Sequence, residues 1–173
     1  MYKSSSILKL LSAGTVKATT LLVCAALMLG SCSGPELVKD HVLMPEEGWH
    51  AESVVQFSFE VKDAQQAHNV YYFLRQNLNY PYSNIYLRDS IVDAQGYVAH
   101  TSTKQFFVAN PFTGQPIGSG LAEMRDNTML GYEAIKFPKA GKYTIRVRQY
   151  MRISPLPGIL SAGVMVLPLE GKK

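Results

Sequence analysis

The sequence is poor in cysteine, and this scarcity excludes several classes of small domain. Its 173 residues contain two cysteines, Cys24 and Cys32, which are too few for a disulfide-stapled scaffold. The four histidines lie in separate segments, and none pairs with a cysteine at the spacing of a zinc site. We therefore expect neither a disulfide framework nor a bound metal, and the residue pattern indicates no cofactor.

Acidic residues are absent from the first 31 positions, and this absence explains the basic character of the chain. A formal net charge of +4 would by itself suggest a nucleic-acid partner. Residues 1–31 contribute three lysines and no acid, whereas the remainder has 14 basic and 13 acidic residues. Because that remainder is nearly neutral, the composition gives no support for nucleic-acid binding.

The first 31 residues have the organisation of a secretory signal peptide. Lys3, Lys9 and Lys17 precede an uncharged run over residues 18–31, with an apolar core at residues 21–29. This core is too short to span a bilayer whose hydrocarbon region is about 30 Å thick. We therefore predict a cleaved export signal and not a permanent membrane helix.

The end of the apolar run matches a bacterial lipobox. Leu29 is followed by two small residues, Gly30 and Ser31, and then by Cys32. The pattern predicts cleavage between Ser31 and Cys32 and attachment of diacylglycerol to the Cys32 thiol. Several acyl chains make a durable anchor, because each buried methylene contributes about 0.8 kcal/mol.

The alternative is an ordinary secreted protein with a free thiol at Cys32. Cys24 would leave with the signal peptide, so no disulfide can form within the mature chain.

Residues 32–40 are expected to form the lipidated terminus and a short tether. Ser33 follows the cysteine, where an aspartate would favour inner-membrane retention in many Gram-negative bacteria. The tether also lacks the dense acidic run of surface-exported lipoproteins in some of these bacteria. We therefore expect an anchor in the outer membrane, at its periplasmic face.

From His41 onward the hydrophobic pattern has the period of two that indicates β-strands. Val55, Phe57 and Phe59 alternate with polar side chains, as in a strand with one wet face. Strands are expected at about residues 41–44, 54–61, 69–76, 84–92, 104–109, 142–151 and 163–167. Residues 120–130 are expected to hold at most one short helical turn.

This pattern predicts a single all-β domain over residues 41–170. About seven strands favour two packed antiparallel sheets, an Ig-like or jelly-roll-like sandwich, with a barrel as the alternative. Tyr143 follows a proline- and glycine-containing corner at residues 137–141 and precedes a late strand. We therefore expect Tyr143 to act as a tyrosine-corner residue.

Candidate catalytic groups are few. Glu123 and Asp126 lie three residues apart and could act as paired carboxylates in acid–base catalysis. With Arg125 between them, a solvated turn or an internal ion pair is the favoured interpretation. No serine lies in a nucleophile-elbow pattern, and the loop glycines do not form a phosphate-binding motif. We interpret the protein as a non-enzyme.

Two groups of residues have the composition of a recognition surface. The first surrounds one turn and consists of Arg75, Asn77, Tyr80, Pro81, Tyr82, Asn84 and Tyr86. Tyrosine and arginine are enriched at binding hot spots because they bury large areas and keep polar tips. The same residues would equally suit a strand and turn that close the sandwich. The second group, Arg146, Arg148 and Arg152 with Gln149 and Met151, is interpreted as a solvated basic face, with an acidic partner's docking site as the alternative. The candidate interaction residues are Arg75, Asn77, Tyr80, Tyr82, Tyr86 and Arg152.

Several tracts of the mature chain occur in the order and spacing of a known family. They are residues 75–77, 80–86, 118–120 with Asp126, 137–138 with Gly141 and Tyr143, 149–152, and 156–159. The series resembles the gliding motility lipoprotein GldH family over about residues 38–168, and the lipoprotein leader fits it too.

The resemblance implies a lipid-anchored accessory of the machinery with which gliding bacteria move over surfaces. That machinery is tied to the type IX secretion system, so envelope proteins are the implied partners. The family supplies no catalytic residues.

A different hypothesis, from the residues themselves, is a carbohydrate-binding lipoprotein in which Tyr80, Tyr82 and Tyr86 stack against sugar rings. A third is an enzyme that uses Glu123 and Asp126.

Overall fold

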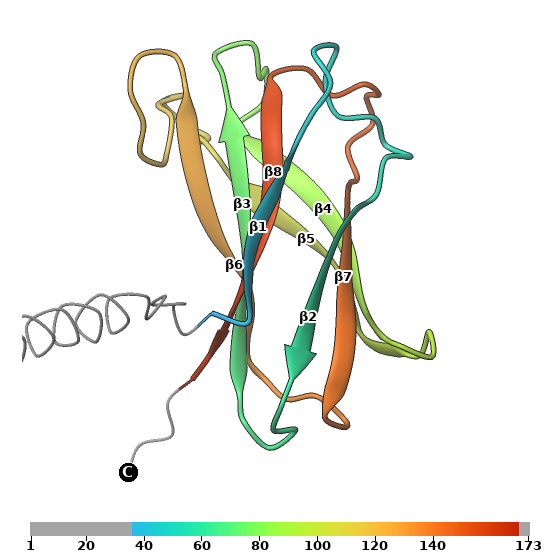
Figure 1. The fold of residues 1–173 in the computed structure, drawn as a ribbon. Helices are drawn as coiled ribbons and strands as arrows, with labels where there is room; N and C mark the ends of the chain where they lie inside the picture. Colours follow the sequence, from blue (N-terminus) through green and yellow to red (C-terminus); the bar gives the residue numbers. More distant parts are fainter. Residues whose placement is uncertain (1–35, 170–173) are drawn as a thin grey trace, which may run out of the picture. The chain divides into compact units, whose positions relative to one another are not determined.

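The computed structural model describes residues 36–169, which form eight β-strands (Figure 1). The strands are β1 (Val38–Leu43), β2 (Val55–Val61), β3 (His68–Gln76), β4 (Asn84–Asp93), β5 (Val98–Phe107), β6 (Arg125–Ile135), β7 (Gly141–Gln149) and β8 (Ile159–Pro168). Cys24, Ser31 and Cys32 lie outside the described residues. Within residues 36–169 no helix is long and apolar enough to cross a membrane.

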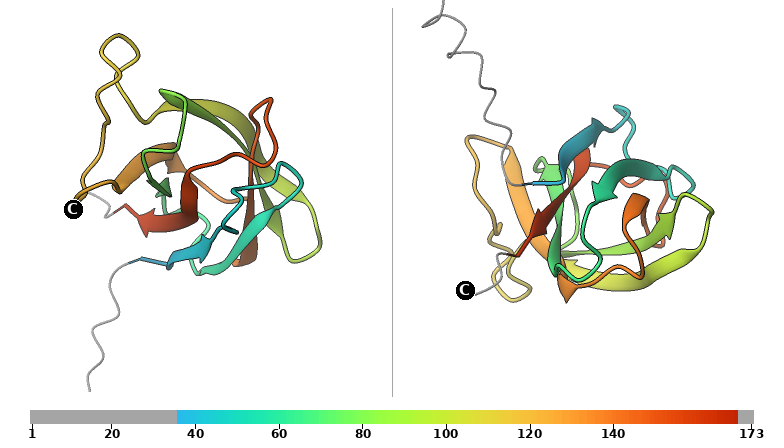
Figure 2. Two further views of the ribbon diagram at one scale, coloured as in Figure 1. Left: turned by 90° about the horizontal axis from the view of Figure 1, so that it is seen from above. Right: turned by 60° about the horizontal axis from the view of Figure 1, so that its bottom comes forward.

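The strands form two four-stranded sheets that face each other (Figure 2). One sheet has the order β1-β8-β3-β6 and the other has the order β2-β7-β4-β5, and all neighbouring strands are antiparallel. The predicted antiparallel sandwich is therefore confirmed, with eight strands in place of about seven. The first strand begins at Val38, three residues before the expected start of the domain.

The additional strand is β6, in the region where at most one helical turn was expected. Its inward positions are Asn127, Met129 and Gly131, so the apolar alternation that marks a strand is weak. Gly131 faces the ring of Tyr72, because a Cβ atom there would lie 2.4 Å from Tyr72 Cε2. The aromatic ring from β3 thus occupies the space that a side chain on β6 would fill. A turn does lie at residues 121–124, but the strand that begins at Arg125 was missed. A side chain supplied by another strand leaves no pattern in the sequence of β6.

Alternation along the strands builds the core between the sheets. In β2 every second residue is buried, as the spacing of Val55, Phe57 and Phe59 predicts. Trp49 has no exposed surface and joins the core from the loop that precedes β2. Tyr143 is buried, and its hydroxyl donates a hydrogen bond of 2.9 Å to the carbonyl of Lys139, four residues upstream. This is the expected tyrosine-corner geometry.

The core also contains a hydrogen-bonded carboxylate. Asp89 on β4 is 3% exposed and accepts hydrogen bonds from the hydroxyls of Ser102 and Tyr132. Ser102 belongs to the same sheet, whereas Tyr132 comes from β6 of the opposite sheet. A buried carboxylate is tolerated only when such donors replace water. Asp89 therefore links the two sheets, and its burial leaves it no access to a substrate.

His68 is expected to make the domain less stable at acidic pH. Its side chain is buried beside Phe137, and burial lowers the pKa of His68 below the usual 6.5, against weaker opposing effects of the Gln66 backbone and Asp63. The unfolded chain therefore binds a proton at a pH where the folded chain does not. We expect the free energy of unfolding to fall as the pH drops from about 7 to about 5.5.

Denaturant unfolding at several pH values tests this expectation. The His68→Phe variant should show a smaller loss of stability over this range, whereas His41→Gln, a change at an exposed position of β1, should keep the wild-type slope. An unchanged slope in His68→Phe would assign the pH dependence to other groups.

Candidate binding surface

The residues predicted to form a recognition surface divide between two sheets and a turn. Arg75 lies on the outer face of the β1-β8-β3-β6 sheet. Asn77 and Tyr80 lie in the connection between β3 and β4, at one end of the sandwich. Tyr82, Tyr86 and Arg152 line one depression on the other sheet. The structure thus brings together three of the six residues.

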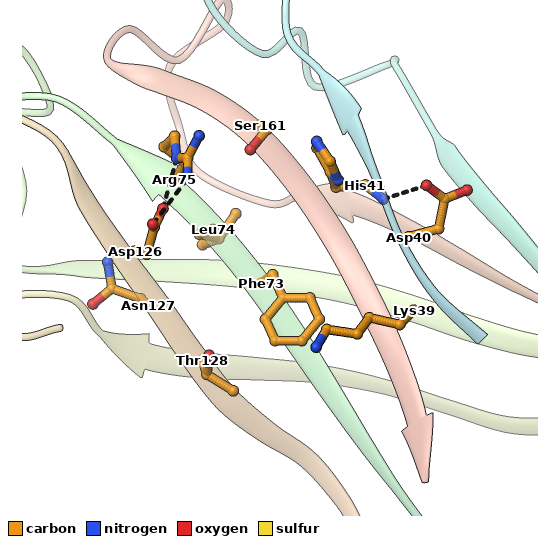
Figure 3. Close-up of a pocket in the computed structure, with 10 residues that line it drawn as sticks. All are labelled: Lys39, Asp40, His41, Phe73, Leu74, Arg75, Asp126, Asn127, Thr128 and Ser161. Carbon is orange, nitrogen blue, oxygen red and sulfur yellow. Dashed lines mark hydrogen bonds and ion pairs between the residues drawn. The ribbon is translucent and has the colours of Figure 1, made fainter. Parts of the chain in front are cut away.

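Arg75 forms an ion pair across its sheet with Asp126 of β6 (Figure 3). Its Nε and a terminal nitrogen donate to the two carboxylate oxygens at 2.7 and 2.9 Å. The guanidinium holds the pKa of Asp126 below its usual range, and the carboxylate raises the pKa of Arg75. Both side chains are about half exposed, so the pair contributes little to stability.

The same ion pair bears on the catalytic hypothesis for Glu123 and Asp126. Asp126 is bonded to Arg75 through both oxygens, and a lowered pKa keeps it ionised near neutral pH. A carboxylate in this state is unsuited to donate a proton as a general acid. The internal ion pair predicted for this segment therefore exists, with Arg75 as the partner and not Arg125.

Residues 36–169 also contain no group of three or more histidine, aspartate or glutamate side chains placed to hold a metal ion.

Asn77 and Tyr80 hold two connections of the sandwich together. The backbone N–H of Asn77 donates to the carbonyl of Gly158 at 2.9 Å, and its side-chain oxygen accepts from the Asn79 N–H. The Tyr80 side chain is buried, its hydroxyl donates to the Asn84 carbonyl at 2.7 Å, and burial raises its pKa. Gly158 has a φ of +78°, and a Cβ atom there would lie 2.3 Å from the Tyr80 nitrogen. Asn77 and Tyr80 therefore stabilise the fold, and their side chains do not form part of an exposed recognition surface.

Tyr82, Tyr86 and Arg152 line an open depression with a volume of ≈ 580 Å³. Pockets for small ligands have volumes of about 300–1,000 Å³. The remaining lining residues are Asn84, Thr103, Tyr150 and Met151. Tyr82, Tyr86 and Tyr150 are 39%, 38% and 50% exposed, so their rings are accessible. Tyr82 packs edge-on against Tyr80, and the Tyr86 hydroxyl donates to Gln105 Oε1 at 3.0 Å. These contacts restrict two of the three rings.

Arginines continue this surface along the same face of the sheet. Arg88 of β4 and Arg148 of β7 are direct register partners, and Arg146 pairs in register with Ser90. The guanidinium carbons of Arg88 and Arg148 lie 5.4 and 5.8 Å from the centre of the Tyr150 ring. None of the three ion pairs found among residues 36–169 involves these arginines or Arg152. We call Arg88, Arg146, Arg148 and Arg152 with Tyr82, Tyr86 and Tyr150 the arginine–tyrosine surface.

Sequence reasoning found part of this surface. The alternation over residues 84–92 places Arg88 on the polar face of its strand, but it does not identify the neighbouring strand. The strand expected over residues 142–151 places Tyr150 on the same face as Arg146 and Arg148, but nothing in the sequence marks this tyrosine as part of a binding surface. In the structure Tyr150 lies just after β7 and is exposed. Both residues become prominent only once β4 and β7 are adjacent.

A family model and two curated relatives all place this chain with the same protein family. The family model described as GldH lipoprotein matches residues 36–166. The chain is 32% identical over 145 residues to the gliding motility lipoprotein GldH of Flavobacterium johnsoniae, covering 83% of this chain and 88% of the relative. It is 26% identical over 147 residues to a GldH homolog of Christiangramia forsetii, covering 81% and 88%.

Likenesses to solved structures are more distant. A structure of infectious bursal disease virus, strain Gx, matches with a TM-score of 0.40 and 12% identity, over 79% of this chain and 33% of that chain. The arabinose-bound α-L-arabinofuranosidase MgGH51 matches with a TM-score of 0.37 and 10% identity, over 75% and 19%. Likenesses at this level carry no functional information.

Proposed function

The chain belongs to the GldH lipoprotein family, and from this membership we propose that it is a non-catalytic accessory of the gliding motility and type IX secretion machinery. A lipoprotein is anchored to a membrane of the cell envelope. The observation that carries the proposal is the family match, which extends over residues 36–166 and so over nearly the whole sandwich. Envelope proteins of that machinery are the proposed partners.

The proposed anchor is a lipid on Cys32 in the outer membrane, with the domain on the periplasmic side. Cleavage before Cys32 would leave five residues between the lipidated Cys32 and Val38, where β1 begins. The six residue steps from Cys32 to Val38 reach at most about 20 Å when fully extended. Nine-residue strands such as β3 are about 30 Å long. The tether therefore keeps the end of the sandwich that contains Val38 near the membrane.

The arginine–tyrosine surface extends to the opposite end of the sandwich. Val38 pairs with Val166 near the end of β8, and Val166 pairs with Val70 near the start of β3. The loop with Tyr82 follows the far end of β3, at the top of Figure 1. A partner that approaches from the aqueous side would meet this end of the domain first, which makes Tyr82 and Arg152 suitable positions for contact.

Photo-crosslinking in intact cells tests this function. A photoreactive residue at Tyr82 or at Arg152 is expected to give discrete adducts with envelope proteins of the motility or secretion machinery. The control position is Gln65, an exposed residue in the β2–β3 turn at the other end. Deletion of the gene is expected to reduce secretion, and also spreading where the organism glides. The absence of specific adducts, together with normal secretion after deletion, would contradict the proposal.

Carbohydrate binding is the second candidate function, because exposed rings and polar side chains share one depression. Tyr82, Tyr86 and Tyr150 present accessible ring surface there, whereas Tyr80 points into the sandwich. Asn84 and Thr103 supply hydrogen-bonding groups beside the rings. Such a combination of apolar faces and a few polar groups suits a sugar ring. The saccharide titrations described below test this candidate.

A further inference from the structure

We infer that the arginine–tyrosine surface binds an anionic saccharide, meaning a sugar chain that carries carboxylate or phosphate groups. The inference rests on the carbohydrate-binding candidate and narrows its ligand class. Two independent features of the surface carry it: positive charge without an internal counterion, and aromatic rings held around an open depression.

The positive charge of this surface has no counterion among the described residues. Four of the six arginines of the chain lie on it, and none belongs to an ion pair found in residues 36–169. On the outer face of β2, Glu60 is at the far end of the sheet and pairs in register with Lys142. Of the two acidic side chains on β4, Asp89 is buried on the inner face, and Asp93, at the end of the strand, is already ion-paired with Lys139. The surface therefore favours a negatively charged ligand.

The pairing of Arg88 with Arg148 strengthens this argument. Direct register partners on adjacent antiparallel strands have Cβ atoms about 4.5–5.5 Å apart, and like charges at such positions are destabilising. Both guanidinium groups are also gathered at one ring, that of Tyr150. A carboxylate or phosphate bound between them would relieve their repulsion and accept several N–H donors at once.

The three tyrosine rings beside the arginines favour a saccharide ligand over a simple inorganic anion. Tyr150 contacts the two guanidinium groups and also lines the depression with Tyr82 and Tyr86. A ligand in the depression would thus meet ring faces and charge within one site. Arg152 adds a cation on the same lining, and Asn84 and Thr103 add neutral polar groups. A sugar ring with an acidic substituent has both the apolar and the charged part that this arrangement accommodates.

The test uses the mature lipoprotein in uncharged detergent micelles, titrated with matched pairs of ligands. Trigalacturonate is compared with its uncharged methyl ester, and mannose 6-phosphate is compared with mannose. We expect binding of the anionic member of each pair and at least about tenfold weaker binding of the neutral member. Binding should weaken at high salt, because exposed charge interactions are screened.

Variants locate the site. Arg88→Gln with Arg148→Gln is expected to weaken binding of the anionic ligands about tenfold or more. Arg152→Gln is a second variant in the connection after β7, where no strand pairing is altered, and it should also weaken binding. The matched control is Arg75→Gln, because Arg75 is exposed, lies on the other sheet and is already paired with Asp126. Circular dichroism establishes that each variant is folded.

Each outcome has a distinct meaning. Equal binding of the neutral and anionic ligands would overturn the inference and leave the carbohydrate-binding candidate standing. No binding of any saccharide would overturn both, and the crosslinking and deletion experiments would still decide the motility and secretion function. Binding unchanged in the arginine variants would place the site elsewhere and overturn the inference. Tighter binding of hexaglutamate than of either saccharide would make the surface a docking site for an acidic protein, and would also overturn it.

Discussion

Replacing Cys32 with serine is expected to move the protein from the membrane fraction to the soluble fraction. Serine cannot form the thioether to diacylglycerol, so the acyl chains proposed as the anchor would be lost. Each acyl methylene contributes about 0.8 kcal/mol of membrane affinity, and the loss of several chains abolishes stable attachment. Fractionation of cells, with mass spectrometry of the N-terminal peptide, measures both the location and the modification.

Cys24 provides a matched control for this experiment. It lies eight positions earlier, inside the segment expected to be removed on export. Cys24→Ser should therefore leave membrane attachment and the mature mass unchanged. Retention of Cys32→Ser in the membrane after a high-salt wash would contradict a lipid anchor at this position.

Replacing Trp49 with alanine is expected to cost about 3–5 kcal/mol of stability. The side chain has no exposed surface, and its indole N–H donates to the Ser53 carbonyl at 2.9 Å. The Trp49 backbone also exchanges hydrogen bonds of 2.9 and 3.0 Å with Leu156, in the connection between β7 and β8. Truncation leaves a cavity where two loops meet the core, and domains of this kind have only about 5–15 kcal/mol in total.

Denaturant unfolding measures this loss. Because Trp49 is the only tryptophan of the chain, unfolding should be followed by circular dichroism and not by tryptophan fluorescence. Trp49→Phe retains an aromatic ring and loses mainly the indole hydrogen bond, so it should cost clearly less than alanine. A loss below about 1 kcal/mol for alanine would mean that the site collapses around the smaller side chain.

Strand positions were predictable where one face of the strand is buried against apolar neighbours. In β2 the alternation in the sequence matches the alternation of burial residue by residue. In β6 the inward positions are occupied by Asn127, Met129 and Gly131, and the ring of Tyr72 fills the space above Gly131. A pattern of period two cannot reveal a strand whose core contribution comes from a side chain on another strand.

The recognition residues could be identified by type but not sorted by role. Tyr80 and Tyr82 are two residues apart in a turn, where no periodicity indicates direction. The first is buried with its hydroxyl bonded to Asn84, and the second is exposed on the depression. Arg75 was grouped with them because it is close in sequence, yet it lies on the outer face of the opposite sheet beside Asp126.

The sequence by itself determined the all-β class, the inward and outward faces of most strands, and the resemblance to the GldH family; an export signal before Cys32 stays a prediction. These properties depend on residues close together in the chain, or on motifs in a fixed order. Only the tertiary structure decided which strands are neighbours. Arg88 and Arg148 are 60 positions apart, and their meeting over Tyr150 follows from the adjacency and register of β4 and β7. Sheet order is set by packing of the whole core, so the arginine–tyrosine surface emerges only when the sandwich is complete.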